Sequence, residues 1–421
     1  MTNSQAATAS VSSRGSTQVG FSIFDQMLSS VTSLLVVVLL ARSSTTEKFG
    51  RFSVIFAVYV VVLGICRALT TEPMAVQYGR LDEERHDHDP TKSVLSTSCL
   101  IGTMAMLVCA VPALLVPSDR VAWLLLGLAL PGLMIQDACR YVLIAGSRAE
   151  QACVLDAIWL IGTLGLSFTV DRHDPNVDLW LTSTWLVCGV LSGLVGVWLL
   201  RRSLVGPTRG WLRRMLPLGW RFTLEFLAQN GSAQFVILVV GWRSVVEAAA
   251  VRGASTILAP VGVILSGAGS ALIPRLKSPL EDGKRRASST AAVVAGAACV
   301  LTVVCVPAAY FAPERLGRAA LGASWSASRR LMPFLAIASL FNALAFGPNI
   351  VLRALGRAND TMRSRVAGGV LLVAAVSVGF ALGVGLYVLA TLLAIPAAVT
   401  GALLWRAVPR HTSDQRTAGV T

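Results

Sequence analysis

Long apolar stretches alternate with short polar connections along almost the whole chain. A membrane-spanning helix needs about 20 mostly apolar residues, and the hydropathy pattern contains twelve stretches of suitable length. They cover residues 19–40, 52–71, 94–116, 121–144, 152–170, 179–200, 216–240, 247–272, 290–311, 330–352, 366–383 and 385–405. The pattern therefore predicts an all-α integral membrane protein with about twelve transmembrane helices.

The final apolar run, residues 366–408, is too long for a single membrane span. Gly379, Gly383 and Gly385 interrupt this run, and glycine tolerates the backbone conformations that tight turns require. We therefore expect two helices here, separated by a turn at these glycines.

The second half of the chain repeats features of the first half in the same order. A Val-Leu-x-Ala-x-x-Arg motif at residues 142–148 returns at residues 351–357, and Pro73 and Pro274 close corresponding helices. Six helices per repeat is an even number, so the two repeats are expected to be parallel and related by an axis along the membrane normal. The predicted segments are a disordered tail (1–18), a six-helix bundle (19–200), a basic linker (201–215), a second six-helix bundle (216–408) and a tail (409–421).

Composition supports the membrane assignment and indicates an orientation. Hydrophobic residues make up 54% of the chain, charged residues make up 14%, and the mean hydropathy is +0.68. The net charge of +14 fits basic loops that meet anionic lipid headgroups, and no basic soluble domain remains that would bind nucleic acid. Lys and Arg concentrate in the loops on the same side as the two chain ends, which predicts that both termini are cytoplasmic.

The pattern of reactive residues argues against an enzyme. The eight cysteines lie in or beside apolar stretches without CxxC spacing and resemble small buried hydrophobic side chains. His86, His88, His173 and His411 lie outside the predicted spans, and no phosphate-loop, zinc or serine-hydrolase motif occurs. The acidic loop 82–89 is better explained as a solvated loop than as a divalent-ion site. We therefore expect no catalytic residue, no bound metal and no cofactor.

Polar side chains lie inside the predicted spans of the first half. An ionised side chain at the bilayer centre costs about 2.5–3.5 kcal/mol or more, so it suggests a function. Asp25 and Gln26 lie in the first span, Arg67 lies near the end of the second, and Glu72 follows it. Asp25 and Arg67 are expected at similar depth, where they either pair to hold two helices together or line a polar cavity. Gln26 and Glu72 are candidates for binding substrate in such a cavity.

A second polar group lies near the predicted cytoplasmic ends of the fourth and fifth spans. It contains Asp137, Arg140 and Asp156. In the functional interpretation, Arg67 and Arg140 bind an anionic headgroup, and Asp25 binds a coupling ion or proton. In the structural interpretation, which the sequence favours for this second group, the side chains join helices or extend to the membrane interface.

The first helix of the second half carries a polar stripe. Arg221 and Glu225 are four residues apart and share one helix face. Glu225 is the candidate for a second ion-coupling carboxylate, and Gln229 and Asn230 are candidates for binding sugar hydroxyls. Hydrogen bonding between helices is the structural alternative. Arg252, inside the outer end of the next helix, either holds a phosphate or extends to the interface.

Residues 20–80 carry a series of motifs that resembles a known family. They are Asp25-Gln26-x-x-Ser29-Ser30, Leu40-Ala41-Arg42, Phe49-Gly50-Arg51-Phe52, Tyr59 and Arg67-Ala68-Leu69-x-x-Glu72-Pro73. This series resembles the start of Wzx-like polysaccharide flippases, which belong to the multidrug/oligosaccharidyl-lipid/polysaccharide (MOP) exporter superfamily. Beyond residue 80 the resemblance rests on the two six-helix halves.

The resemblance implies a MATE-like pair of bundles with alternating access. It also implies export of an undecaprenyl-pyrophosphate-linked oligosaccharide across the bacterial plasma membrane, driven by a Na+ or H+ gradient. Expected partners are membrane lipids and a glycan polymerase or glycosyltransferases of the same pathway. Such a headgroup needs a polar path, because its charges and hydroxyls would otherwise lose their water in hydrocarbon. Two alternatives stay open: a cation-coupled MATE-like exporter of small amphiphiles, and a membrane-embedded glycan polymerase or ligase.

Overall fold

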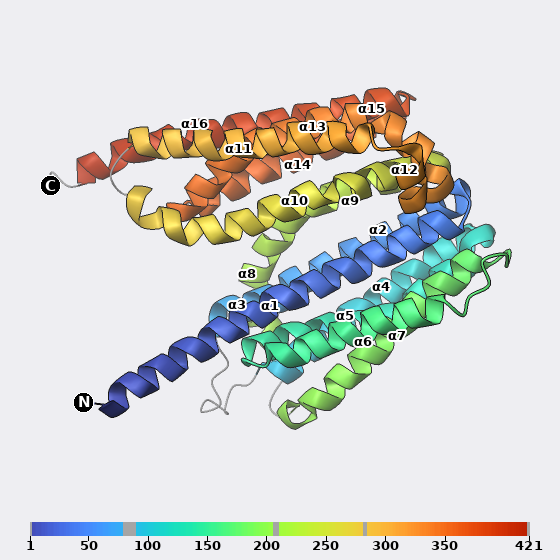
Figure 1. Cartoon of the computed structure of the whole chain (residues 1–421), viewed down its shortest axis with the longest axis horizontal. Coiled ribbons are helices and arrows are strands. Elements are labelled where there is room, and N and C mark those ends of the chain that lie inside the picture. The colour runs from blue at the N-terminus through green and yellow to red at the C-terminus, as the bar shows by residue number, and fades with distance from the viewer. Residues whose placement is uncertain (1, 79–89, 205–209, 281–283, 419–421) are drawn as a thin grey trace. The chain divides into compact units, whose positions relative to one another are not determined.

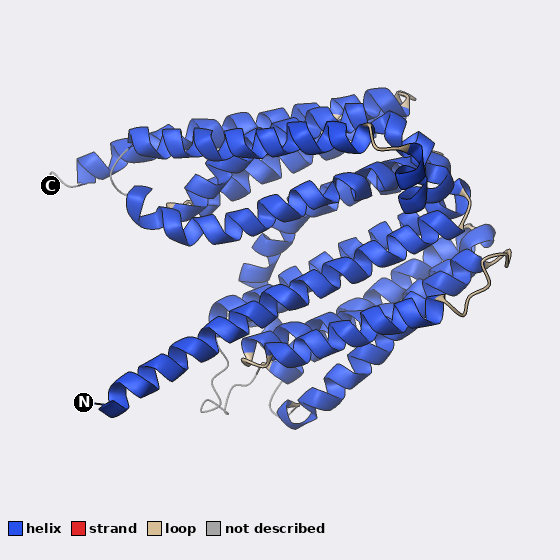
Figure 2. Cartoon of the chain, in the orientation of Figure 1, coloured by secondary structure: helices blue, strands red, loops and turns tan. Residues whose placement is uncertain are grey.

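The computed structural model describes residues 2–78, 90–204, 210–280 and 284–418. Within these ranges the regular elements are all helices (Figure 2). Twelve helical segments there are long and apolar enough to cross a membrane, and each overlaps one of the twelve predicted stretches. The predicted fold class, an all-α membrane protein with about twelve spans, is confirmed. The acidic loop 82–89 lies outside the described residues.

Contacts divide the chain into two compact units. Figure 1 labels the elements of these units and colours them by residue number. The first unit is Met1–Ser44 with Val58–Phe226, and the second is Thr45–Ala57 with Leu227–Thr421. Helix α2 (Thr46–Leu69) contributes its first half to the second unit and its second half to the first.

The other elements of the first unit are α1 (Thr2–Ser43), α3 (Thr71–Tyr78), α4 (Thr91–Leu115), η2 (Pro117–Asp119), α5 (Arg120–Ala145), α6 (Ala149–Ser167), α7 (Val177–Leu200), η3 (Arg201–Ser203) and α8 (Trp211–Phe226). Those of the second unit are η4 (Leu227–Gly231), α9 (Ser232–Arg243), α10 (Val245–Leu280), α11 (Lys284–Tyr310), α12 (Glu314–Leu321), η5 (Gly322–Ser324), α13 (Trp325–Ala354), α14 (Ala358–Ala381), α15 (Leu386–Leu392) and α16 (Ala394–Ala418). The element η4 is a π-helix, and η2, η3 and η5 are 3-10 helices.

Two observed boundaries differ from the predicted segments. The sequence suggests a tail over residues 1–18, whereas α1 begins at Thr2; the Ala and Gln residues of this stretch are good helix formers. The sequence also places the division between halves in the linker 201–215. The contacts place it at Phe226, where the seventh span changes from α-helix to the π-helix η4.

The two units repeat the same helix pairings. In the first unit α4 packs on α5 and α5 packs on α7; in the second, α11 packs on α13 and α13 packs on α16. The first span packs on the fifth through α1 and α6, and the seventh packs on the eleventh through α9 and α14. Each pair recurs six spans later, as expected for a six-helix repeat.

The repeated sequence motif builds the same turn twice. Ser147 and Gly356 both have positive φ, at 55° and 75°, in the left-handed conformation that often ends a helix. The N–H of Arg148 donates to the carbonyl oxygen five residues earlier at 2.8 Å, and the N–H of Arg357 does the same at 2.9 Å. The Val-Leu pair of each motif is buried in the core of its own unit.

Glycine allows close approach within the corresponding helix pair of each unit, on α4 in the first unit and on the other member of the pair, α13, in the second. A Cβ on Gly102 of α4 would lie 2.6 Å from the Cα of Pro131 in α5, and one on Gly347 of α13 would lie 2.0 Å from the carbonyl oxygen of Ala291 in α11. Side chains larger than hydrogen are therefore excluded at both crossings. The predicted turn of the final apolar run is also present, because α14 ends at Ala381 and Gly383 has φ +66°.

Candidate functional site

Four helices of the first unit bring five ionisable side chains together. Asp25 comes from α1, Arg67 from the last turn of α2, Asp137 and Arg140 from α5, and Asp156 from α6. Asp137 and Arg140 are three residues apart, which places both on one face of α5. Helix α6 packs against both α1 and α5. We call these five residues the ion cluster.

Arg67 forms the more accessible side of the ion cluster. Its Nε donates to Asp137 Oδ2 at 2.8 Å, and its Nη2 donates to Asp137 Oδ1 at 2.6 Å. This is the two-point geometry in which a guanidinium binds a carboxylate most strongly. The Tyr141 ring centroid lies 5.4 Å from the guanidinium carbon. The side chain of Arg67 stays 24% exposed, so it can meet a further anionic group.

Arg140 lies at the centre of the ion cluster with only 2% of its side chain exposed. Its Nη2 donates to Asp25 Oδ2 at 2.6 Å, and its Nη1 donates to Asp137 Oδ1 at 3.1 Å and to Ser29 Oγ at 3.2 Å. Its Nε lies 3.0 Å from Asp156 Oδ1, although the geometry of that ion pair does not make a hydrogen bond. One guanidinium therefore contacts all three carboxylates.

The ion cluster contains more carboxylates than guanidiniums. Three aspartates face two arginines, so the fully ionised cluster carries one excess negative charge. Gln136 Nε2 donates to Asp156 Oδ1 at 3.0 Å. In contrast, Asp25 Oδ1 and Asp156 Oδ2 are buried and receive no hydrogen bond from the described residues. A buried charge needs full compensation, and a single proton or monovalent cation would supply it here.

The pairing differs from the one that the sequence suggests. Arg67 does not bind Asp25; Arg67 binds Asp137, and Asp25 binds Arg140. The sequence favours a structural role for Asp137 and Asp156, and their ion pairs with Arg67 and Arg140 do join helices. Both aspartates also share Arg140 with Asp25. Gln136, which donates to the ion cluster through Asp156, is a neighbour that sequence reasoning missed, although the run Gln136-Asp137-x-x-Arg140 marks it.

The other predicted residues of the first unit lie near the accessible side of Arg67 or on exposed helix faces. Gln26 is exposed on α1, and Glu72 is exposed in the first turn of α3. The Glu72 carboxylate interacts electrostatically with both Arg67 and Glu225. Glu225 is half-buried near the end of α8. The structure thus brings Arg67, Glu72 and Glu225 into one electrostatic neighbourhood.

Gln229 and Asn230 lie in the π-helix η4 of the second unit and are exposed. They fall in the interior of the membrane-crossing segment Trp211–Arg243. Arg365 Nη1 donates to Gln229 Oε1. The sequence places Gln229 on the same helix face as Arg221, but the wider π turn rotates the residues that follow and breaks this α-helical spacing.

Arg252 of α10 is buried in the second unit with 7% exposure. Its Nη2 donates to the Ser53 carbonyl oxygen at 3.3 Å and to Gln234 Oε1 at 3.0 Å, and the Phe56 ring centroid lies 5.0 Å away. Its Nε has no acceptor among the described residues. The side chain therefore points into the unit and does not extend to the membrane interface. No described carboxylate pairs with it.

Comparisons with known proteins establish the fold. No family model matches the chain, and no curated protein matches it. An inward-facing multidrug resistance MATE family transporter of the MOP superfamily aligns with a TM-score of 0.67 and 14% identity, over 92% of this chain and 95% of that chain. The lipid II flippase MurJ in an inward closed conformation gives a TM-score of 0.71 at 11% identity, over 93% and 87%. The chain therefore has the fold of these MATE and MurJ transporters, and the predicted MATE-like architecture is confirmed.

Proposed function

We propose that this protein is a flippase that moves an undecaprenyl-pyrophosphate-linked oligosaccharide, or a related polysaccharide precursor, across the bacterial plasma membrane. It works by alternating access driven by a Na+ or H+ gradient. The ion cluster carries the proposal, because Asp25 Oδ1 and Asp156 Oδ2 are buried without a hydrogen-bond donor among the described residues. A membrane-buried site with uncompensated carboxylate oxygens is suited to taking up and releasing a cation.

Coupling requires that the ion bind one conformation more tightly than the other. Asp25 lies on α1 and Asp156 lies on α6, and both contact the single guanidinium of Arg140. A cation between these two carboxylates would hold α1 against α6, whereas its loss would leave two like charges beside one guanidinium. Arg140 is enclosed by carboxylates, so we assign it to holding this coupling site rather than to binding cargo. Glu225 remains the proposed second coupling carboxylate.

The cargo side of the proposal rests on one accessible guanidinium and on amides. Arg67 keeps an accessible edge, and Gln26 and Glu72 lie on exposed faces of the same unit. In the second unit, the exposed amides Gln229 and Asn230 lie inside a membrane-crossing segment. A guanidinium group suits a pyrophosphate, and amides suit sugar hydroxyls. Arg67 would repel the organic cations that many drug exporters carry, so an anionic glycolipid is the better cargo.

A second candidate function is cation-coupled export of small amphiphiles. The likeness to MATE transporters favours it, as does the excess of carboxylates in the ion cluster. A direct comparison of cargoes separates the two functions. Proteoliposomes that contain the full chain would be given either a fluorescent undecaprenyl-pyrophosphate-oligosaccharide or a cationic dye, under the same imposed cation gradient. Movement of the glycolipid supports the flippase, and dye movement without glycolipid movement supports the exporter.

A further inference from the structure

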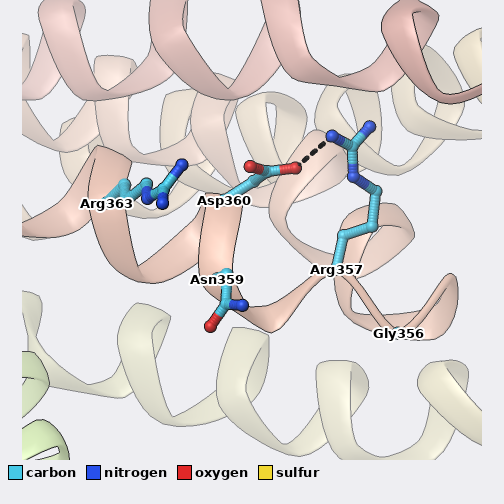
Figure 3. Close-up of a pocket in the computed structure, with 5 residues that line it drawn as sticks. All are labelled: Gly356, Arg357, Asn359, Asp360 and Arg363. Atoms are coloured by element: carbon cyan, nitrogen blue, oxygen red, sulfur yellow. Dashed lines mark ion pairs between the residues drawn. The ribbon is translucent and has the colours of Figure 1, made fainter.

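A basic cavity lies at the turn between α13 and α14 of the second unit, whereas the ion cluster belongs to the first. It has a volume of about 460 Å³ and is lined by Gly356, Arg357, Asn359, Asp360 and Arg363 (Figure 3). Arg357 Nη2 forms an ion pair with Asp360 Oδ2 at 2.5 Å, which neutralises that carboxylate. A second contact fixes Arg357, because its Nη1 donates to the carbonyl oxygen of Ala407 at 3.3 Å.

Arg363 supplies a second cation to the cavity. It lies three residues after Asp360 on the same face of α14, and its side chain is exposed. No described residue accepts a hydrogen bond from its guanidinium or pairs with the Asn359 amide. The cavity also lies at the start of a 24-residue helix, whose dipole favours an anion. The N–H groups of Asp360 and Thr361 already donate to the carbonyl oxygen of Arg357. With the Arg357–Asp360 pair neutral, the positive charge of Arg363 and the side-chain donors of Arg363 and Asn359 remain.

The first half of the chain contains the same turn with different side chains. Arg148 directly precedes α6 as Arg357 directly precedes α14, and the Nη2 of Arg148 donates to Gln151 as Arg357 pairs with Asp360. The two turns differ six residues after the arginine. The exposed Val154 occupies this position after Arg148, whereas Arg363 occupies it after Arg357. The turn therefore folds without a basic residue at this position, so folding alone does not explain Arg363.

The cavity lies at a turn between two candidate spans. One span ends at Ala354 and the next begins at Asn359, so Asn359, Asp360 and Arg363 lie in the first two turns of that span. Lipid headgroups are expected at the ends of transmembrane helices. Basic pockets between transmembrane helices at this depth bind the phosphates of anionic lipids. We propose that the cavity binds the phosphate group of an anionic phospholipid, with Arg363 and the Asn359 amide as the principal donors. This inference is independent of the proposed function.

Binding of defined lipids by the purified full-length protein tests this inference. Native mass spectrometry in detergent would compare phosphatidylglycerol with phosphatidylcholine, and inorganic phosphate would be added separately. The variants are Arg363→Val, which copies the first turn, Arg363→Lys, which keeps the charge, and Arg214→Val, a control that removes an exposed arginine of α8. We expect phosphatidylglycerol to bind preferentially and Arg363→Val to lower its affinity about fivefold. Arg363→Lys should retain part of the affinity, and Arg214→Val should retain all of it.

Three results would overturn the inference. Equal binding of the two lipids would show that the headgroup charge is not recognised. Equal losses of phosphatidylglycerol affinity in Arg363→Val and Arg214→Val would show that the effect comes from the overall charge of the protein. Tight binding of inorganic phosphate that depends on Arg363, without a preference for phosphatidylglycerol, would assign the cavity to a soluble anion.

Discussion

Arg140 Nη2 donates a 2.6 Å hydrogen bond to Asp25 Oδ2, joining the first span to the fourth between side chains that are 2% and 1% exposed. The sequence suggests a different partner for Asp25, and the observed pair changes what each residue is expected to do. Asp25 shares the guanidinium of Arg140 with Asp156. Asp25 Oδ1 is therefore left for a proton or a coupling cation. Breaking a buried pair by removing one partner costs about 3–5 kcal/mol, which makes this cluster sensitive to mutation.

Asp137 should be the aspartate that contributes most to stability. It accepts two hydrogen bonds from Arg67 and one from Arg140, so Asp137→Asn leaves two guanidiniums without their shared charge. We expect Asp137→Asn to lower the free energy of unfolding by about 3–5 kcal/mol, and Asp156→Asn to lower it less. Thermal melting of the two purified variants in the same detergent would show which substitution destabilises the protein more. Equal melting temperatures for the two variants would contradict this assignment.

Exchanging the charges of Arg67 and Asp137 separates pairing from cargo binding. The double variant Arg67→Asp with Asp137→Arg restores an ion pair between α2 and α5, so its melting temperature should recover relative to either single variant. Transport should stay impaired, because the double variant carries the guanidinium on α5 and no longer has the exposed guanidinium of Arg67 on α2. Full recovery of transport along with stability would mean that Arg67 acts only as a structural partner.

The amides of η4 should affect cargo more than folding. Gln229 and Asn230 are exposed, and Gln229 accepts one hydrogen bond from Arg365, so changing both to Ala should lower the free energy of unfolding by no more than about 0.5–1.5 kcal/mol. Each amide hydrogen bond contributes about 0.5–1.5 kcal/mol, so the apparent affinity for a glycolipid cargo should fall about tenfold. Titration of cargo in a transport assay would measure this, with Thr391→Ala on α15 as an exposed polar control. An unchanged affinity in the double variant would remove η4 from the cargo site.

Membrane orientation follows from the distribution of Lys and Arg and has a simple test. A reporter fused after Thr421 should read as cytoplasmic, and one inserted at Gly383, between the last two spans, should read as extracytoplasmic. The two fusions check each other, because a single span separates them. The same location for both reporters would contradict the twelve-span topology, and exchanged locations would reverse the orientation.

The sequence predicts the spans and the last turn well because bilayer thickness imposes a length on each apolar stretch. Gly383, for example, ends the eleventh span with a positive φ, as its position in the run 366–408 suggests. The repeat is also visible in sequence, because each Val-Leu-x-Ala-x-x-Arg motif specifies one turn and one buried pair.

The partners within the ion cluster are not predictable in the same way. Whether Asp25 meets Arg67 or Arg140 depends on how α1, α2 and α5 are rotated about their axes, and hydropathy does not define that rotation. The π turn η4 leaves no signal in composition either, since it changes only which carbonyl each N–H reaches. Sequence reasoning therefore found the residues of the candidate site but not their connections.

Gradient-driven flipping in proteoliposomes tests the central claim most directly. The full chain and its Asp25→Asn variant would be reconstituted with a fluorescent undecaprenyl-pyrophosphate-oligosaccharide, and its movement between leaflets followed with and without a Na+ or H+ gradient. We predict that one gradient accelerates flipping by the unmodified protein within the usual coupling range of about 5–150-fold, and that Asp25→Asn removes the acceleration. Flipping that ignores both gradients, or that stays gradient-dependent in a folded Asp25→Asn variant, would contradict the role of the ion cluster.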